Sequence, residues 1–116
     1  MPPERNTLID IHGVAPLLQV FDMPAAIHFY RDVLGFKVSA RSEPGDNCNW
    51  AWLKRNGAEL MLNTAYEADL RPPPPDPARV AAHGDTCLYF GCADLDAAYQ
   101  YLRQHGVNAK GPKTIA

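Results

Sequence analysis

Asp22-Met-Pro-Ala-Ala-Ile-His-Phe-Tyr-Arg-Asp-Val-Leu-Gly-Phe-Lys-Val38 is the stretch that decides the fold, because its pattern returns as Asp94-Leu-Asp-Ala-Ala-Tyr-Gln-Tyr-Leu-Arg-Gln-His-Gly-Val107. Each copy opens with an Asp that can cap a helix and closes on a Gly suited to the left-handed position after a helix. Between these ends, apolar residues recur at helical spacing. They are Ile27, Tyr30 and Leu34 in the first copy and Leu95, Ala98 and Leu102 in the second. The chain is therefore predicted to be a tandem repeat whose two units pack together around a concave surface.

The size and charge of the chain limit what it can be. Its 116 residues, 47% of them hydrophobic and 21% charged, suffice for one modest domain, so we predict a single domain over residues 1–116. The net charge of −2 comes without a basic run, which argues against nucleic acid as a partner. No stretch approaches the roughly 20 apolar residues of a membrane helix, and no signal peptide is evident. We therefore expect no membrane partner and a cytoplasmic location.

The cysteines point to the same compartment. Cys48, Cys87 and Cys92 are odd in number and lack a CxxC spacing. This pattern favours reduced thiols over a disulfide framework.

Residues 14–64 are predicted to form a first module with the order βαβββ. Its strands are expected at residues 14–21, 35–41, 49–54 and 58–63, where β-branched, aromatic and alternating apolar residues gather. Pro24 falls in the first turn of the intervening helix, where its missing N–H has no helical partner to lose. Asn56-Gly57 is a strong two-residue hairpin signal between the last two strands.

The remainder of the chain is predicted to contain a connector and a second, incomplete module. Residues 65–84 include a run of four prolines and are expected to be an extended connector, with a spacer favoured over a functional lid. Residues 85–116 then restart the pattern with a strand at 86–93, the second helix and a short strand at 107–110. Only six residues follow Lys110, too few for a further hairpin. We expect either a shortened version of a longer protein or a sheet that a partner completes.

The motif resembles a known superfamily. A strand that ends in Asp, followed by an Ala-Ala helix, Phe29-Tyr30 and Leu34-Gly35-Phe36, is similar to the opening module of the vicinal oxygen chelate superfamily. This superfamily groups glyoxalase I, bleomycin-resistance proteins, fosfomycin-resistance enzymes and extradiol dioxygenases. The resemblance covers residues 14–110 and implies an α+β fold in which two βαβββ modules, each a curved four-stranded sheet, form a cleft. It also implies a homodimer, which the open edge of a shortened second module would favour.

The same resemblance identifies where a metal would bind. In metal-dependent members, ligands stand on the first and last strand of each module, and here the first-strand positions are Ala15 and Cys87 while Glu59 matches the last strand of the first module. Alanine cannot bind a metal, and a lone thiol suits a hard, oxygen-rich site poorly. We therefore predict no metal and no cofactor, with a divalent metal as the alternative. A substitute site would need three or four convergent ligands. Most of the four histidines, which are His12, His28, His83 and His105, are expected on the surface instead.

Strand alternation predicts which residues line the cleft. Alternate residues share a face, which groups Glu59 with Met61 and Asn63, Cys87 with Tyr89 and Gly91, Ala15 with Leu17 and Gln19, and Trp50 with Trp52. Such a wall is aromatic and apolar with a few polar groups, as in small-molecule pockets. Core packing is the favoured alternative for Leu17 and Met61, and an equal one for the tryptophans. The predicted ligand-binding residues are Leu17, Gln19, Trp50, Trp52, Met61, Asn63, Cys87 and Tyr89.

Glu59 is the candidate catalytic residue. A carboxylate among Ala, Leu and Met is costly to desolvate unless it is paired, bound to a cation or protonated, and such a site suits a general base. The alternative, weighed equally, is that its strand lies at an edge and that Glu59 faces solvent near Lys54 or Arg55.

Three hypotheses about function follow. The favoured one is a metal-free protein that binds a small aromatic or amphipathic molecule, in the manner that the resemblance to bleomycin-resistance proteins implies. The second is an enzyme, either a metal-dependent lyase, isomerase or dioxygenase, or a metal-free enzyme with Glu59 as the base. The third is an interaction scaffold without a ligand.

Overall fold

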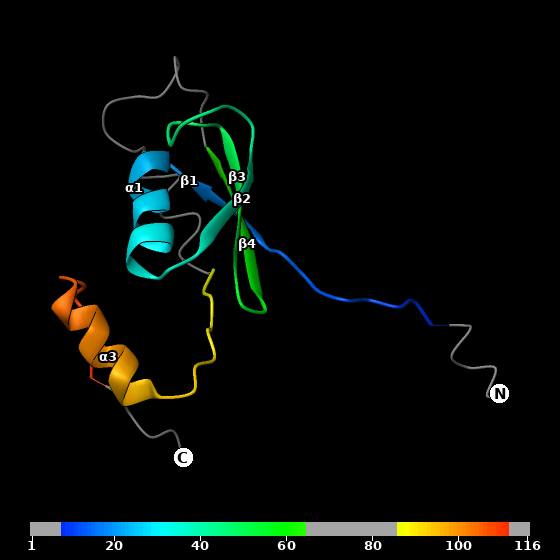
Figure 1. The fold of residues 1–116 in the computed structure, drawn as a ribbon. Coiled ribbons are helices and arrows are strands. Elements are labelled where there is room, and N and C mark those ends of the chain that lie inside the picture. The colour runs from blue at the N-terminus through cyan, green and yellow to red at the C-terminus, as the bar shows by residue number, and fades with distance from the viewer. Residues whose placement is uncertain (1–7, 65–85, 112–116) are drawn as a thin grey trace.

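The computed structural model describes residues 8–64 and 86–111, which form a mixed α+β fold with a curved, open, four-stranded sheet and helices. Figure 1 shows the helix α1 beside the sheet, to its left, and α3 apart from it. None of the described helices has the length and apolar character that a membrane-crossing segment requires.

The sheet has the order β1-β4-β3-β2. β1 pairs in parallel with β4, whereas β3 is antiparallel to both β4 and β2. The parallel pair requires a crossover connection, and the helix between β1 and β2 begins it. The predicted βαβββ order of the first module is confirmed. Its strands are β1 (Leu17–Val20), β2 (Lys37–Arg41), β3 (Trp50–Arg55) and β4 (Ala58–Thr64).

The first predicted helix is confirmed, and its start is the one that the sequence indicates. Asp22 Oδ1 accepts a hydrogen bond of 3.1 Å from the amide of Ala25, which caps α1 (Met23–Ile27). The helix continues as η2 (His28–Val33), a π-helical segment that the sequence did not predict. Gly35 follows with φ +85°, the left-handed conformation that glycine adopts without steric cost.

Two strand ends show how local chemistry sets the sheet. The predicted hairpin turn is confirmed, since Asn56 takes φ +53° and Arg55 pairs directly with Ala58. The sequence predicts a first strand from residue 14, but β1 begins at Leu17. Pro16 has no N–H to donate to a ladder, although its carbonyl accepts a 2.8 Å hydrogen bond from the amide of Met61.

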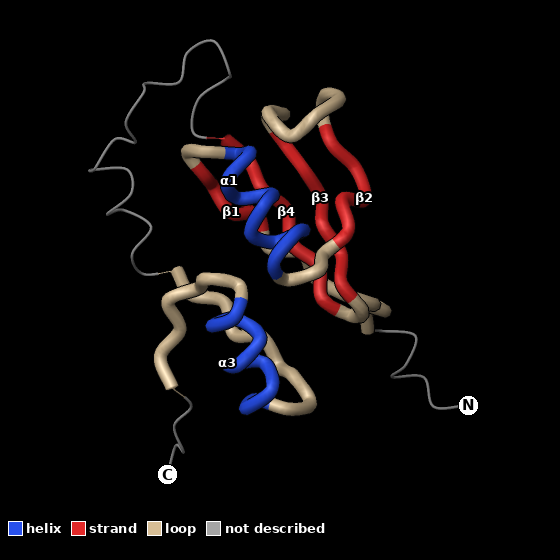
Figure 2. The backbone as a smooth tube through the Cα atoms, turned by 60° about the vertical axis from the view of Figure 1, so that its left-hand side comes forward, coloured by secondary structure: helices blue, strands red, loops and turns tan. Residues whose placement is uncertain are grey.

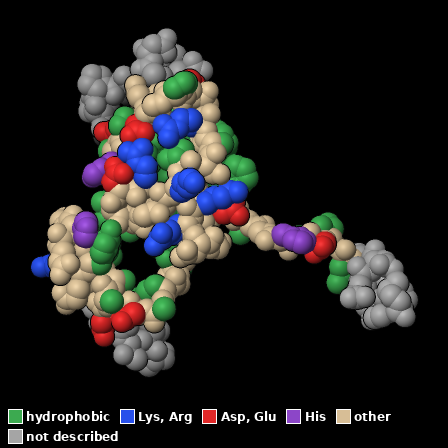
Figure 3. Space-filling view, viewed as in Figure 1, with side chains coloured by type: hydrophobic (Ala, Val, Ile, Leu, Met, Phe, Trp, Pro, Cys, Tyr) green, Lys and Arg blue, Asp and Glu red, His purple; other side chains and the backbone are tan. Residues whose placement is uncertain are grey.

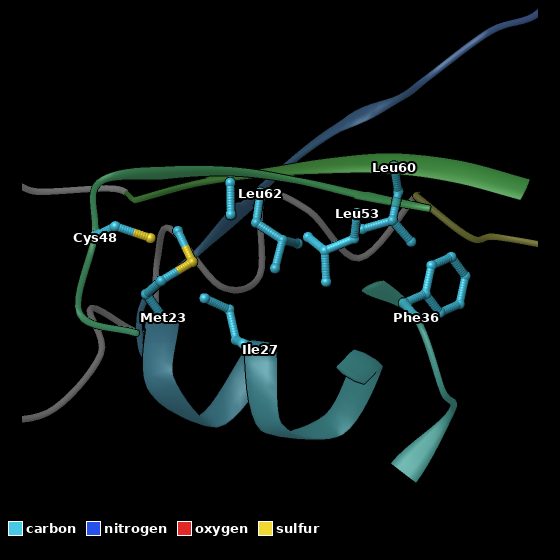
Figure 4. Close-up of a cluster of buried hydrophobic side chains, with 8 residues drawn as sticks. Met23, Ile27, Phe36, Cys48, Leu53, Leu60 and Leu62 are labelled. Carbon is cyan, nitrogen blue, oxygen red and sulfur yellow. The ribbon is translucent and has the colours of Figure 1, made fainter. Parts of the chain in front are cut away.

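The hydrophobic core lies between α1 and one face of the sheet (Figure 4). Alternate residues of β3 and β4 point to this face, and all of the core side chains are buried. The cluster consists of Met23, Ile27, Phe36, Cys48, Ala51, Leu53, Leu60 and Leu62.

The second half of the described chain contains one helix and no strand. α3 (Leu95–Gln104) begins where Asp94 Oδ1 accepts a 3.0 Å hydrogen bond from the amide of Ala97, and Gly106 follows it with φ +78°. The second helix is thus confirmed. The strands predicted at 86–93 and 107–110 are wrong, because a strand needs a hydrogen-bonded neighbour and the described residues offer these segments none. The predicted connector, residues 65–84, lies outside the described residues.

α3 contacts the first module at the C-terminal end of η2. The hydroxyl of Tyr101 donates a hydrogen bond to the carbonyl of Val33, and the rings of Phe36 and Phe90 meet edge to face at 6.0 Å. Figure 2 shows α3 beyond the end of the α1 helix rather than over the sheet. The face of the sheet opposite α1 is therefore not covered by α3.

Candidate functional site

The candidate site is the face of the sheet that points away from α1, here called the open face. It is defined by the residues that alternate with the core residues along β1, β3 and β4. Their side chains are half-buried, except that of Leu17, which is 53% exposed. The open face comprises Leu17, Gln19, Trp50, Trp52, Glu59, Met61 and Asn63.

The strand register arranges these residues in two rows across the sheet. Leu17 pairs with Met61, which pairs with Trp52. Directly paired side chains lie within contact distance on a sheet surface. The first row is therefore continuously apolar across three strands.

The second row runs parallel to the first and is more polar. Gln19 pairs with Asn63, and Asn63 pairs with Trp50. Two amide side chains thus stand beside an indole, which offers donors and acceptors next to an aromatic surface. A cavity of about 440 Å³ runs along β1 and is lined by Leu17, Leu18, Gln19, Val20, Asn63 and Thr86.

Glu59 is held by two side chains of β3, one from the open face and one next to it. Trp52 Nε1 donates a 3.1 Å hydrogen bond to Glu59 Oε1, and Lys54 Nζ lies 3.9 Å from the same oxygen. Lys54 Nζ also lies 4.4 Å from the centre of a Trp52 ring, so the three side chains form one cluster. β4 stands between β1 and β3 and is not an edge strand, although the side chain of Glu59 is still 29% exposed.

Among the residues that define the open face, Glu59 is the one carboxylate that a metal ion could use. Extending the parallel register of β1 and β4 by two residues puts Ala15 beside Glu59. These are the two metal-ligand positions that the resemblance implies for the first module. Ala15 offers only a methyl group there. Within residues 8–64 and 86–111, no three His, Cys, Asp or Glu side chains gather closely enough to hold a metal ion. A lone carboxylate that is paired with an ammonium group does not fit a divalent ion, which needs several convergent ligands.

The described histidines lie on the surface, as expected. His12 and His28 pair with nearby aspartates at 2.8 and 3.0 Å, and the ring of His105 stacks on Tyr101. All three are exposed. His83 lies outside the described residues.

Two predicted site residues are not on a strand. Cys87 and Tyr89 belong to the irregular segment before α3, and Tyr89 is 92% exposed. The argument that alternation would place them on one wall with Gly91 fails, because no ladder holds this segment in an extended register. A role for them in ligand binding stays a prediction.

A network of charges, absent from the sequence-based predictions, ties η2 to the loop between β2 and β3. Arg31 donates to Asp46 at 2.8 and 2.9 Å and to Asp32 at 2.8 and 3.0 Å. These hydrogen bonds lower the pKa of Asp46 and lower that of Asp32 to about 2. Arg41 approaches Asp46 at 3.4 Å. The network lies on the helix side of the sheet and is structural, since it fixes the loop that leads into Trp50.

Comparison with models of known protein families identifies one match, which covers residues 11–114. The chain belongs to the Glyoxalase/Bleomycin resistance protein/Dioxygenase superfamily. No curated protein matches it. The membership agrees with the resemblance drawn from the repeated helix motif.

Solved structures share the fold of this superfamily member. The chain is similar to TnmS3, an antibiotic binding protein from Streptomyces sp. CB03234, with 26% identity, a TM-score of 0.62 and coverage of 93% of this chain and 82% of that chain. A glyoxalase/bleomycin resistance protein from the same organism gives 27% identity, a TM-score of 0.54 and coverage of 88% and 82%.

A further similar structure is the bleomycin-binding protein from bleomycin-producing Streptomyces verticillus, complexed with copper(II)-bleomycin. It gives 23% identity, a TM-score of 0.57 and coverage of 83% of this chain and 66% of that chain. At that identity the likeness shows the fold alone.

Proposed function

We propose that this superfamily member binds a small aromatic or amphipathic molecule on its open face, without a metal. The observation that carries the proposal is the pairing of Trp50 and Trp52 with the polar and apolar side chains of β4 on a face that α3 leaves uncovered. Indole rings supply a large rigid contact area for an aromatic ligand. The names of two similar structures, an antibiotic binding protein and a bleomycin-binding protein, agree with this kind of function.

The role proposed for each residue follows from its place in the two rows. Trp52, Met61 and Leu17 provide a flat apolar surface for rings. Gln19 and Asn63 orient polar substituents, because an amide can both donate and accept. The ligand is thus stacked over the first row and held in register by the second.

A fluorescence titration tests the proposal. Bleomycin and a panel of aromatic compounds are added to the protein, and quenching of Trp50 and Trp52 is followed. We expect saturable quenching by at least one of these compounds. Met61→Glu should remove it, since the new charge stands at the centre of the apolar row.

Ala25→Glu is the matched control. It introduces the same side chain at an exposed position in the first turn of α1, on the other side of the sheet, where an acidic residue suits the helix dipole. It should bind as the wild type does. No saturable quenching with any compound, or equal losses in both variants, would overturn the proposal.

An enzymatic role for Glu59 is the second candidate. Its carboxylate stands on the open face beside the proposed ligand surface, and the indole N–H of Trp52 fixes its orientation. In that position the carboxylate can serve as a general base for a metal-free enzyme. Glu59→Gln keeps an oxygen that can accept the Trp52 hydrogen bond but removes the basic carboxylate, so it should abolish any turnover that the wild type shows. Full turnover in this variant would exclude Glu59 as the base.

We further propose that the protein acts as a homodimer in the cytoplasm, without nucleic acid as a partner. Exposed apolar side chains outside both proposed binding surfaces, such as Ile9, Ile11 and Tyr89, support association with a second copy. Three free cysteines support a reducing compartment. Sedimentation equilibrium tests the homodimer, cell fractionation tests the location, and a gel-shift assay tests nucleic-acid binding. A monomer at high concentration would contradict the homodimer.

A further inference from the structure

A second cavity lies away from the open face. It has a volume of about 850 Å³ and is lined by the residues after η2, by the β3–β4 turn and by α3. The hollow beside α3 is visible in Figure 3. Its volume falls within the range of roughly 300–1,000 Å³ that is typical of small-molecule sites.

Apolar side chains from both halves of the chain form most of the wall. Phe36 comes from the first module, whereas Phe90, Leu95, Ala98 and Leu102 come from the second half. Phe90 stays 50% exposed although its ring meets that of Phe36. The wall is thus an aromatic and aliphatic surface that is still partly open to solvent.

A single guanidinium group gives this cavity its charge. Of the described residues that line it, Arg55 alone is charged, and it lies at the end of β3 beside the turn. None of the ion pairs formed within residues 8–64 and 86–111 includes Arg55. A Cβ atom on Gly35 would stand 3.4 Å from Arg55 Cζ, so the guanidinium lies close beside the backbone at Gly35.

We propose that this cavity binds a small, largely apolar molecule that carries one anionic group. The apolar part lies against Phe36, Phe90 and the α3 side chains, and the anion accepts hydrogen bonds from Arg55. A guanidinium suits a carboxylate, sulfonate or phosphate because its planar donors match two anionic oxygens at once. The site is separate from the open face and does not depend on the function proposed there.

A pair of dyes tests the charge and the apolar wall separately. Anilinonaphthalene sulfonate carries rings and an anion, while phenylnaphthylamine has the same rings without the sulfonate. Both are expected to gain fluorescence on binding. Arg55→Gln should weaken the sulfonate about fivefold, the upper range for one exposed ionic contact, and leave the neutral dye within about twofold of wild type.

Arg103→Gln is the matched control, because it removes the same charge from α3 at a position outside the cavity wall. It should leave both dyes unchanged. Ala98→Phe should weaken both dyes, since the larger side chain fills the space between α3 and the turn. Urea unfolding of each variant confirms that it is folded.

Two outcomes would overturn the proposal. One is equal weakening of the sulfonate by Arg55→Gln and Arg103→Gln, which would show a general effect of net charge. The other is the absence of binding by either dye. Neither outcome alters the tryptophan quenching that tests the open face, so the two proposals fail separately.

Discussion

Two leucines on opposite faces of the sheet provide the sharpest test of its two-sided character. Leu62 on β4 is fully buried against α1, whereas Leu17 on β1 is 53% exposed on the open face. The same substitution, Leu→Ala, removes the same atoms from both. Only the environment of the side chain differs between the two variants.

The expected losses of stability differ severalfold. Leu62→Ala forfeits the burial of a whole side chain and leaves a cavity in the core, which costs about 2–5 kcal/mol. Leu17→Ala loses about half of the burial of a leucine and opens no enclosed cavity, which costs about 1 kcal/mol. With a urea dependence of about 1.5 kcal/mol per molar, a 3 kcal/mol loss lowers the unfolding midpoint by about 2 M, against about 0.7 M for Leu17→Ala.

Urea unfolding followed by circular dichroism measures both values. The dependence of the unfolding free energy on urea should be the same in both variants, which would show that the surface exposed on unfolding is unchanged. If Leu17→Ala cost as much as Leu62→Ala, the open face would be a second packed core in solution. That result would refute the interpretation of this face as a surface available to a ligand.

Three smaller perturbations test the local interactions. Asp22→Ala should lower the free energy of unfolding by about 1 kcal/mol because the amide of Ala25 loses its cap, and Asp22→Asn should restore most of it; equal losses in urea melts would refute the capping role. Asp46→Asn should cost up to about 1 kcal/mol near neutral pH. Arg31 lowers the pKa of Asp46 in the folded state, so this stability is present above the unfolded-state pKa of about 3.9 and is lost as the pH falls through the folded-state pKa. The unfolding free energies of the wild type and of Asp46→Asn should therefore converge in acid. A difference between them that does not depend on pH would contradict this explanation. Tyr101→Phe removes the hydrogen bond between α3 and the first module, so amide hydrogen exchange should become faster in α3 and stay unchanged in β4. Unchanged exchange in α3 would show that this hydrogen bond does not hold α3 against the first module.

The first module could be predicted from the sequence because its signals are local. Asp22 and Gly35 mark the helix ends through cap chemistry, and Asn56 marks the turn through its tolerance of positive φ. The alternation of β3 and β4 then separates the core residues from the open face. These signals are complete within a few residues, so no tertiary information is needed to interpret them.

The second half could not be predicted in the same way, because a strand depends on its neighbours. The segment before α3 has the composition of a strand, yet no ladder forms there within the described parts of the chain, and the placement expected for Cys87 and Tyr89 fails with it. The cavity at Arg55 was also missed. It depends on where α3 meets the first module, and the apolar stripe of that helix indicates packing without naming its partner.

The π-helical segment and the charge network were missed for related reasons. The apolar spacing of Ile27, Tyr30 and Leu34 suits an α-helix, and nothing in it indicates a wider turn. Arg31 and Asp46 are far apart in the sequence and meet only because the loop before β3 folds back over η2.

The indole N–H signals in the NMR spectrum of isotope-labelled protein test the central claim most directly. Trp50 and Trp52 are the chain's two tryptophans, both stand on the open face, and Trp52→Phe distinguishes their signals. During addition of bleomycin and the aromatic panel, we predict that at least one compound shifts both indole signals saturably. Compounds that shift only signals from α3 and the β3–β4 turn, or that shift none, would contradict the claim that the open face binds the ligand.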